Sequence, residues 1–98
     1  MTKDYEMMVI ISPKLTAEAA IAENSKLLAS ITETGGELIK IDEWGKRILA
    51  YPINKNNEGY YFVDYFRYES TDIKTIKRQF NINENIIRYM IIMREEKR

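Results

Sequence analysis

The sequence predicts an α+β protein with the element order β-α-β-β-α-β, in which a four-stranded antiparallel sheet carries two helices on one face. Three observations lead to this fold class. Four segments are rich in β-branched and aromatic residues, two have helical periodicity, and a short turn joins the two middle strands. Right-handed crossovers then place both helices on the same side of the sheet.

The first part of the chain predicts a strand followed by a helix. Residues 5–11 form a short apolar run that ends before Pro13, because proline cannot donate to a sheet ladder. Thr16 is a suitable N-cap for the helix, and the glycine pair at 35–36 ends it. Apolar residues recur near the spacing of one helical face, at Ala17, Ala20, Ile21, Leu27, Leu28 and Ile31.

A long hairpin is predicted in the middle of the chain. An extended stretch runs from Glu37 to about Ile53 with a bulge or bend at Gly45, and residues 54–59 form a turn. Residues 60–68 return as a strand in which six of the nine side chains are aromatic. Alternation leaves open which face of this strand meets the helices, since each face includes a charged residue. The two faces are Tyr61, Val63, Tyr65 and Arg67 on one side, and Tyr60, Phe62, Asp64, Phe66 and Tyr68 on the other.

The last part of the chain predicts a second helix and a fourth strand. Ser70 or Thr71 caps the helix, and residues 86–93 form the strand. The whole plan is a ferredoxin-like split β-α-β sandwich in a single domain over residues 1–98, with residues 94–98 as a frayed tail. The apolar stripe of the second helix consists of Ile73, Ile76 and Phe80.

The predicted core lies between the helices and one face of the sheet. Glu6 in the first strand assigns its own side, with Met8 and Ile10, to the open face. We therefore expect Met7 and Val9 to face the helices. The helical side chains expected to pack against them are Ile21, Leu28, Ile31, Ile76 and Phe80.

Composition excludes several kinds of chemistry. The chain has no cysteine and no histidine, which excludes disulfides, thiolate nucleophiles, zinc fingers and histidine acid-base catalysis. No apolar run reaches the ~18 residues that cross a bilayer, and we expect a cytoplasmic protein. The formal net charge is zero, but residues 67–98 hold eight Lys or Arg against five Asp or Glu. This excess fits either a basic C-terminal edge or an ordinary solvated face.

Several blocks of the sequence resemble bacterial small-subunit ribosomal protein six. The most specific block runs from Trp44 to Ile53 and combines Trp-Gly-Lys-Arg with Leu-Ala-Tyr-Pro-Ile. Asp64 departs from the resemblance, because the family usually has an apolar residue there. The resemblance covers residues 3–94, and its other matching positions are Tyr5-Glu6, Gly36, Gly59-Tyr60 and 86–90.

The resemblance implies a non-catalytic structural component of the small ribosomal subunit. It implies binding to the central domain of small-subunit rRNA, with ribosomal protein eighteen as heterodimer partner, during assembly of the subunit platform. No cofactor, metal or small-molecule substrate is expected. The alternative is a ferredoxin-like ligand-sensing or homodimerisation module that buries its open sheet face against a second copy. An acylphosphatase-like enzyme is less supported, since the sequence lacks a glycine-rich phosphate cradle.

The RNA-binding surface is predicted on the open face of the sheet. Arg88 lies in the middle of the last strand between apolar residues, where a guanidinium can stack on a base or bind phosphate. Tyr61 and Tyr65 are either stacking platforms for bases or core residues. With Lys3 and the pair Lys46-Arg47 at the margins of the face, the predicted set is Lys3, Lys46, Arg47, Tyr61, Val63, Tyr65 and Arg88.

Overall fold

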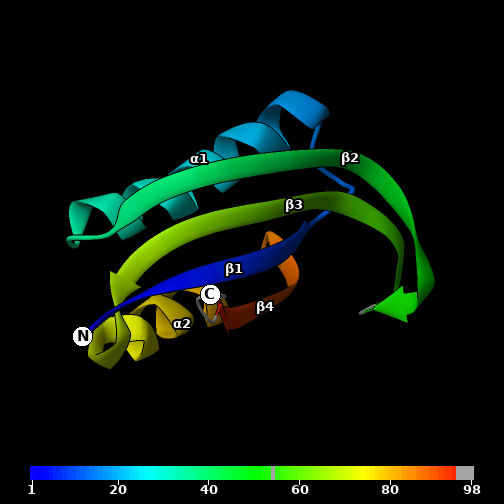
Figure 1. Ribbon diagram of the computed structural model, residues 1–98. Helices are drawn as coiled ribbons and strands as arrows, with labels where there is room; N and C mark the ends of the chain where they lie inside the picture. The colour runs from blue at the N-terminus through cyan, green and yellow to red at the C-terminus, as the bar shows by residue number, and fades with distance from the viewer. Residues whose placement is uncertain (54, 95–98) are drawn as a thin grey trace.

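The computed structural model describes residues 1–53 and 55–94, which form one four-stranded antiparallel sheet and two helices (Figure 1). The sheet order is β2-β3-β1-β4, so β2 and β4 are the edge strands. This arrangement confirms the predicted α+β class and the split β-α-β connections. The elements are β1 (Thr2–Ile11), α1 (Ala17–Glu33), β2 (Glu37–Ile53), β3 (Asn56–Glu69), the 3-10 turn η1 (Ser70–Asp72), α2 (Ile73–Asn81) and β4 (Ile86–Arg94).

The two helices begin in different ways. Thr16 caps α1 as predicted, since its Oγ1 accepts a hydrogen bond from the backbone N–H of Ala19 at 3.1 Å. The prediction that Ser70 or Thr71 caps the second helix was wrong. Those residues form η1, and the Glu69 carboxylate accepts from the backbone N–H of Thr71 at 3.4 Å. Glu69 therefore caps η1, while α2 follows from Asp72, whose side chain makes no capping hydrogen bond.

The boundaries of two strands also differ from the prediction. β3 begins at Asn56, inside the predicted turn, and Asn54 of that turn lies outside the described residues. β4 continues to Arg94, which was assigned to the tail. The remainder of the predicted tail, residues 95–98, also lies outside the described residues.

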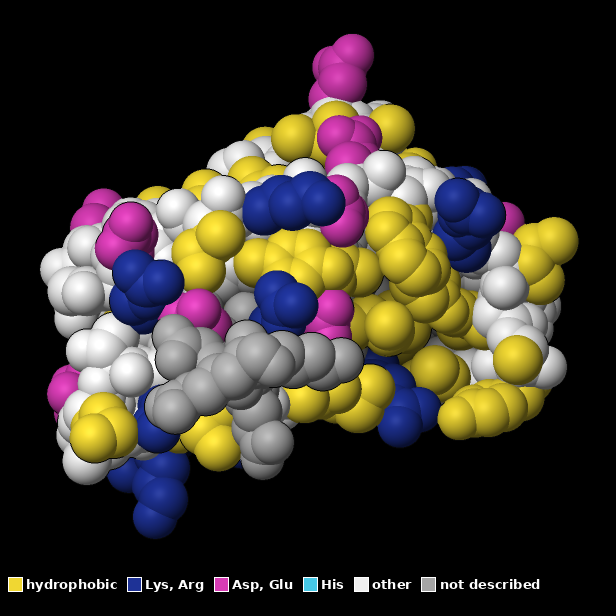
Figure 2. All heavy atoms as spheres, viewed as in Figure 1, with side chains coloured by type: hydrophobic (Ala, Val, Ile, Leu, Met, Phe, Trp, Pro, Cys, Tyr) yellow, Lys and Arg dark blue, Asp and Glu magenta, His cyan; other side chains and the backbone are white. Residues whose placement is uncertain are grey.

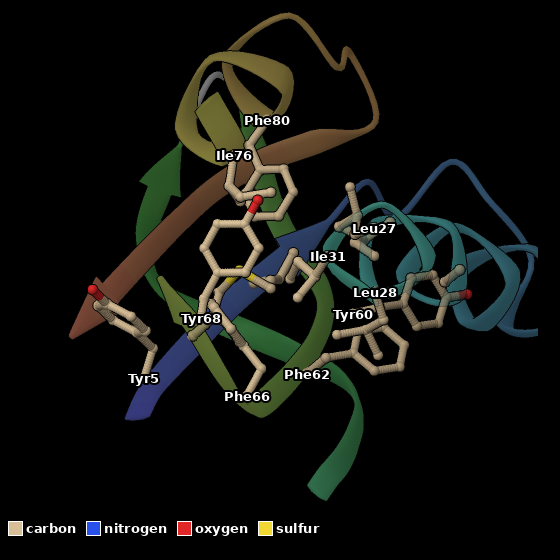
Figure 3. Close-up of a cluster of buried hydrophobic side chains, with 14 residues drawn as sticks. Tyr5, Leu27, Leu28, Ile31, Tyr60, Phe62, Phe66, Tyr68, Ile76 and Phe80 are labelled. Carbon is tan, nitrogen blue, oxygen red and sulfur yellow. The ribbon is translucent and has the colours of Figure 1, made fainter. Parts of the chain in front are cut away.

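Both helices contribute to one core against the sheet (Figure 3). Met7 and Val9 are fully buried in it, which confirms the predicted register of β1. Ile21 was wrongly predicted as a core residue, since its side chain is 40% exposed. The buried stripe of α1 passes through Asn24 and leaves Ile21 at its edge. The other predicted core residues are buried: Leu28, Ile31, Ile76 and Phe80.

The structure decides the orientation of β3, which alternation left open. The helices pack on the face that includes Asp64, and this carboxyl is fully buried. Asn24 of α1 donates to it from Nδ2 to Oδ1 at 3.0 Å, which offsets part of the cost of burying a polar group. The aromatic side chains on the same face are Tyr60, Phe62, Phe66 and Tyr68 (Figure 3).

The β2–β3 hairpin extends beyond the rest of the sheet and curves at its far end (Figure 1). The predicted bulge at Gly45 is confirmed by a φ of +76° and by a shift in register between Glu43 and Gly45. A side chain at Gly59 would place its Cβ only 2.5 Å from Cγ2 of Ile10. Glycine at this position therefore lets the hairpin pack closely against Ile10, which is buried although it belongs to the open face.

Candidate nucleic-acid interface

The open face of the sheet consists of side chains that alternate with the core residues along each strand. Strand register arranges them in rows that cross β3, β1 and β4. Because paired residues share a face, each row brings side chains from distant parts of the chain together. The three central rows are Tyr61, Ile10 and Arg88; then Val63, Met8 and Met90; then Tyr65, Glu6 and Ile92.

An apolar groove crosses this face. One part has a volume of about 250 Å³ and lies beside the curved hairpin, and a second part of about 140 Å³ lies beside Trp44. The two parts meet at Met8 and Met90, which line both. Figure 2 is viewed from the side on which the sheet lies in front of α1. It shows apolar side chains gathered near the centre, with Lys and Arg side chains among them.

Trp44 and Tyr61 form a stacked pair at the margin of the groove. Their ring centroids are 6.3 Å apart and their planes differ by 9°. The Arg47 guanidinium lies 5.9 Å from the Trp44 ring, and its Nε donates to the Trp44 carbonyl oxygen at 3.0 Å. Trp44 is 46% exposed and was absent from the predicted site. Its position beside the predicted bulge at Gly45 was the signal in the sequence that could have identified it.

Tyr65 lies between two cations. Lys40 Nζ is 5.7 Å from the ring centroid, and the Arg94 guanidinium carbon is 5.3 Å from it. A hydrogen bond from its hydroxyl to the Glu6 carboxylate, together with burial, raises the pKa of Tyr65. Lys40 and Arg94 were absent from the predicted site, and Arg94 had been predicted as part of the tail.

Arg88 is exposed on the open face, as predicted. Its Nη1 donates to the hydroxyl of Tyr51 at 3.2 Å, a contact that holds the side chain without neutralising it. Within residues 1–53 and 55–94, no carboxylate lies within ion-pair distance of Arg88 or Arg47.

Arg67 on the same face is engaged differently. Its Nε donates to Oδ1 of Asp4 at 2.8 Å, and its Nη1 lies 3.7 Å from the Glu37 carboxylate. The hydrogen bond from Arg67 lowers the pKa of Asp4. Arg67 thus closes one end of the face with internal ion pairs.

The structure does not bring all seven predicted residues together. Lys3 pairs with Tyr68 and Lys46 pairs with Tyr60, so both lysines lie on the side of the sheet that faces the helices. Lys46 Nζ is 3.3 Å from the Glu58 carboxylate. Placing these lysines at the margins of the open face was therefore wrong, because strand alternation puts them in phase with core residues. Val63 lies on the open face but is only 4% exposed.

Metal binding and membrane spanning have no support within residues 1–53 and 55–94. Within them, no three Asp or Glu side chains gather as ligands for a metal ion. Neither described helix has the length and apolar character required to span a membrane.

The fold and this face define a class of protein. It is a ferredoxin-like α+β protein with one sheet face covered by helices and the other open, and the open face carries aromatic and guanidinium groups. The chain belongs to the ribosomal protein S6 family, whose family model matches residues 4–93. It is therefore a structural component of the small subunit of the cytoplasmic ribosome and not an enzyme.

Relatives and solved structures agree with this assignment. The chain is 42% identical over 90 residues to small ribosomal subunit protein bS6 of Sulfurimonas denitrificans, covering 92% of this chain and 66% of the relative. It is 38% identical over 94 residues to the bS6 protein of Dictyoglomus turgidum, covering 96% of this chain and 97% of that one. The crystal structure of 30S ribosomal protein S6 from Thermotoga maritima matches with a TM-score of 0.89 and 30% identity, covering 96% and 89%. The C-terminal domain of MgtC from Mycobacterium tuberculosis shares the fold alone, with a TM-score of 0.62 and 10% identity.

Proposed function

We propose that this chain binds the central domain of small-subunit rRNA together with ribosomal protein eighteen, as a heterodimer, during assembly of the subunit platform. The open sheet face is its RNA-facing surface in this proposal. The contacts come from Arg88, Tyr61, Tyr65 and Arg47, with Trp44 added from the structure. Val63 belongs to the same face and lines the groove with Met8 and Met90.

The observation that carries the proposal is the environment of Arg88. Its guanidinium is exposed, is held by a neutral hydroxyl, and shares a row of the sheet with Tyr61. A planar cation beside aromatic rings suits unstacked bases and phosphates, which are the parts of RNA that proteins contact in loops and bulges.

The formal net charge of zero supports the proposal that a basic protein partner takes part in RNA binding. A formal net charge of zero gives little long-range attraction to RNA, so counterion release from this chain alone is small. A basic partner would supply most of the phosphate attraction, and this chain would supply stacking and a few directed contacts.

The test is Arg88→Ala, with binding to a transcript of the rRNA central domain measured in the presence of ribosomal protein eighteen. We expect a loss of roughly 1 to 3 kcal/mol in binding free energy without a comparable loss of folding stability. Arg78→Ala is the matched control, because Arg78 is an exposed arginine in the last turn of α2, away from the open face. It should leave binding nearly unchanged.

Two results would contradict the proposal. Equal binding by Arg88→Ala and the unchanged chain would show that the open face does not meet RNA. A stable homodimer in sedimentation experiments, with no gain in RNA affinity from the partner, would instead favour the homodimerisation module, for which the apolar groove is also suited.

A further inference from the structure

A buried carboxyl group lies between the sheet and α1, on the side opposite the proposed RNA surface. Asp64 of β3 is fully buried, and its neighbours in the adjacent strands are Met7 and Ile41. Its hydrogen bond comes from Asn24, which is also buried, with Nδ2 donating to Oδ1 at 3.0 Å. Burial of an isolated carboxylate is costly, so the way in which this group is satisfied needs an explanation.

Each member of the Asp64–Asn24 pair has one buried oxygen atom without a hydrogen-bond partner among the described residues. Oδ2 of Asp64 and Oδ1 of Asn24 are both buried, and neither finds a partner among the described residues. Both atoms are acceptors when Asp64 is ionised, so neither can satisfy the other. A single proton on Oδ2 of Asp64 converts it into a donor for the Asn24 oxygen. One added proton therefore satisfies two orphaned atoms.

We propose that Asp64 and Asn24 form a buried proton-binding site, in which Asp64 is a neutral carboxylic acid and the two side chains exchange reciprocal hydrogen bonds that join β3 to α1. The inference is independent of the RNA-binding proposal, since it concerns the opposite side of the sheet.

The surroundings of Asp64 favour the protonated form. Burial raises the pKa of Asp64 to about 6, and the hydrogen bond from Asn24 acts in the opposite direction. The carboxylates of the neighbouring elements, which could add a like charge beside Asp64, are exposed or directed elsewhere. Glu43 of β2 shares the helix-facing side but is exposed, Glu23 of α1 accepts from Asn83 at 2.9 Å, and Glu6 of β1 lies on the open face.

The lysines of the elements that pack around Asp64 also point away from its carboxyl group. Lys40 of β2 is on the open face with Asp42, and Lys26 of α1 is exposed. Lys46 of β2 shares the helix-facing side but lies in an ion pair with Glu58. The lysines of α2, Lys74 and Lys77, are exposed. No cation is therefore placed to hold Asp64 in its ionised form within the described residues.

The direction of the pH effect follows from the raised pKa. Below about pH 3 both the folded and the unfolded chain hold the proton, so the stabilisation is complete. As pH rises from about 3 to about 6, the unfolded chain loses the proton while the folded chain retains it, and stability falls. Above the folded pKa the stability stays at the lower level.

Asp64→Asn tests the site, because an amide at this position can donate to Asn24 Oδ1 and accept from Asn24 Nδ2 at every pH. We expect the unfolding equilibrium constants of the variant and the unchanged chain to be similar at about pH 3. By about pH 8 they should differ about 100-fold, with the variant more stable. Asp42→Asn is the control, since Asp42 lies in an ion pair with Lys40 on the open face, and its profile should show no such divergence.

A direct titration keeps the proposal testable if Asp64→Asn does not fold. The side-chain carboxyl carbon of Asp64 in the unchanged protein should titrate in carbon-13 NMR about two pH units above an ordinary aspartate. A midpoint at or below the ordinary value of 3.8 would overturn the proposal. So would a variant that is less stable than the unchanged chain at about pH 8.

Discussion

The indole of Trp44 lies nearly parallel to the ring of Tyr61, with 9° between the planes and 6.3 Å between the centroids. The pair joins β2 to β3 at the margin of the open face, next to the bulge at Gly45. Trp44 is also the single tryptophan of the chain. Its fluorescence therefore reports on the open face without any label.

The first prediction uses this reporter. Binding of the rRNA central domain, with the partner present, should quench or shift the emission of Trp44, because bases would stack near it and exclude water. Titration at low and high salt provides the measurement, and high salt should reverse the change. Binding seen by filter retention without any change in emission would place the RNA on another surface.

A second prediction compares two residues of α1. Leu28→Ala should lower the free energy of unfolding by ~2 to 5 kcal/mol, since Leu28 is buried in the core and truncation leaves a cavity. Ile21→Ala should cost under about 1 kcal/mol, because Ile21 lies at the edge of the helix stripe. Urea denaturation of both variants is the measurement. Equal losses would show that α1 docks in a different rotation about its axis.

The close approach of the hairpin to Ile10 gives a third prediction. Gly59→Ala should cost ~1 to 3 kcal/mol, because the new methyl group would overlap Cγ2 of Ile10. The backbone at Gly59 is not in the left-handed region, so the effect is one of space and not of backbone strain. The double variant with Ile10→Ala should lose less than the sum of the single changes. Strict additivity would show that the hairpin does not rest on Ile10.

Adjacent cations on β2 give a fourth prediction. Arg47 lies over Trp44 on the open face, whereas Lys46 lies on the helix-facing side and pairs with Glu58. Arg47→Ala should weaken rRNA binding and reduce its salt dependence by about one counterion. Lys46→Ala should do neither. Equal effects of both substitutions in salt-dependent binding assays would show that RNA follows the edge of β2 and not the open face.

Local rules in the sequence were sufficient for several features. Thr16 caps α1 because an N-cap hydroxyl serves a backbone N–H three residues away, and Gly45 bends β2 because glycine accepts a positive φ. The failure at the second helix has a related cause. Ser70 and Thr71 lie in η1, which the Glu69 carboxylate caps at the backbone N–H of Thr71, and α2 then follows from Asp72 without a side-chain cap.

Errors at the candidate site have two origins. Lys3 is in phase with Tyr5 along β1, so strict use of alternation would have placed it on the core side from sequence alone. Arg94 could not be recognised in the same way. Its position beside Tyr65 requires β4 to continue past the predicted end and to pair with β1.

The sequence by itself determined the order of the elements, the period of each strand and helix, the absence of cysteine and histidine chemistry, and the family resemblance. Only the tertiary structure decided which face of β3 meets the helices. Both faces are apolar with one charged residue each, so the local preference was balanced. The choice depends on Asn24, forty positions away, which gives Asp64 a hydrogen bond inside the core, while Arg67 finds Asp4 at the surface. Alternation cannot choose between the two faces, whereas contacts between distant segments can, because burying a polar group is costly unless it gains a hydrogen-bond partner.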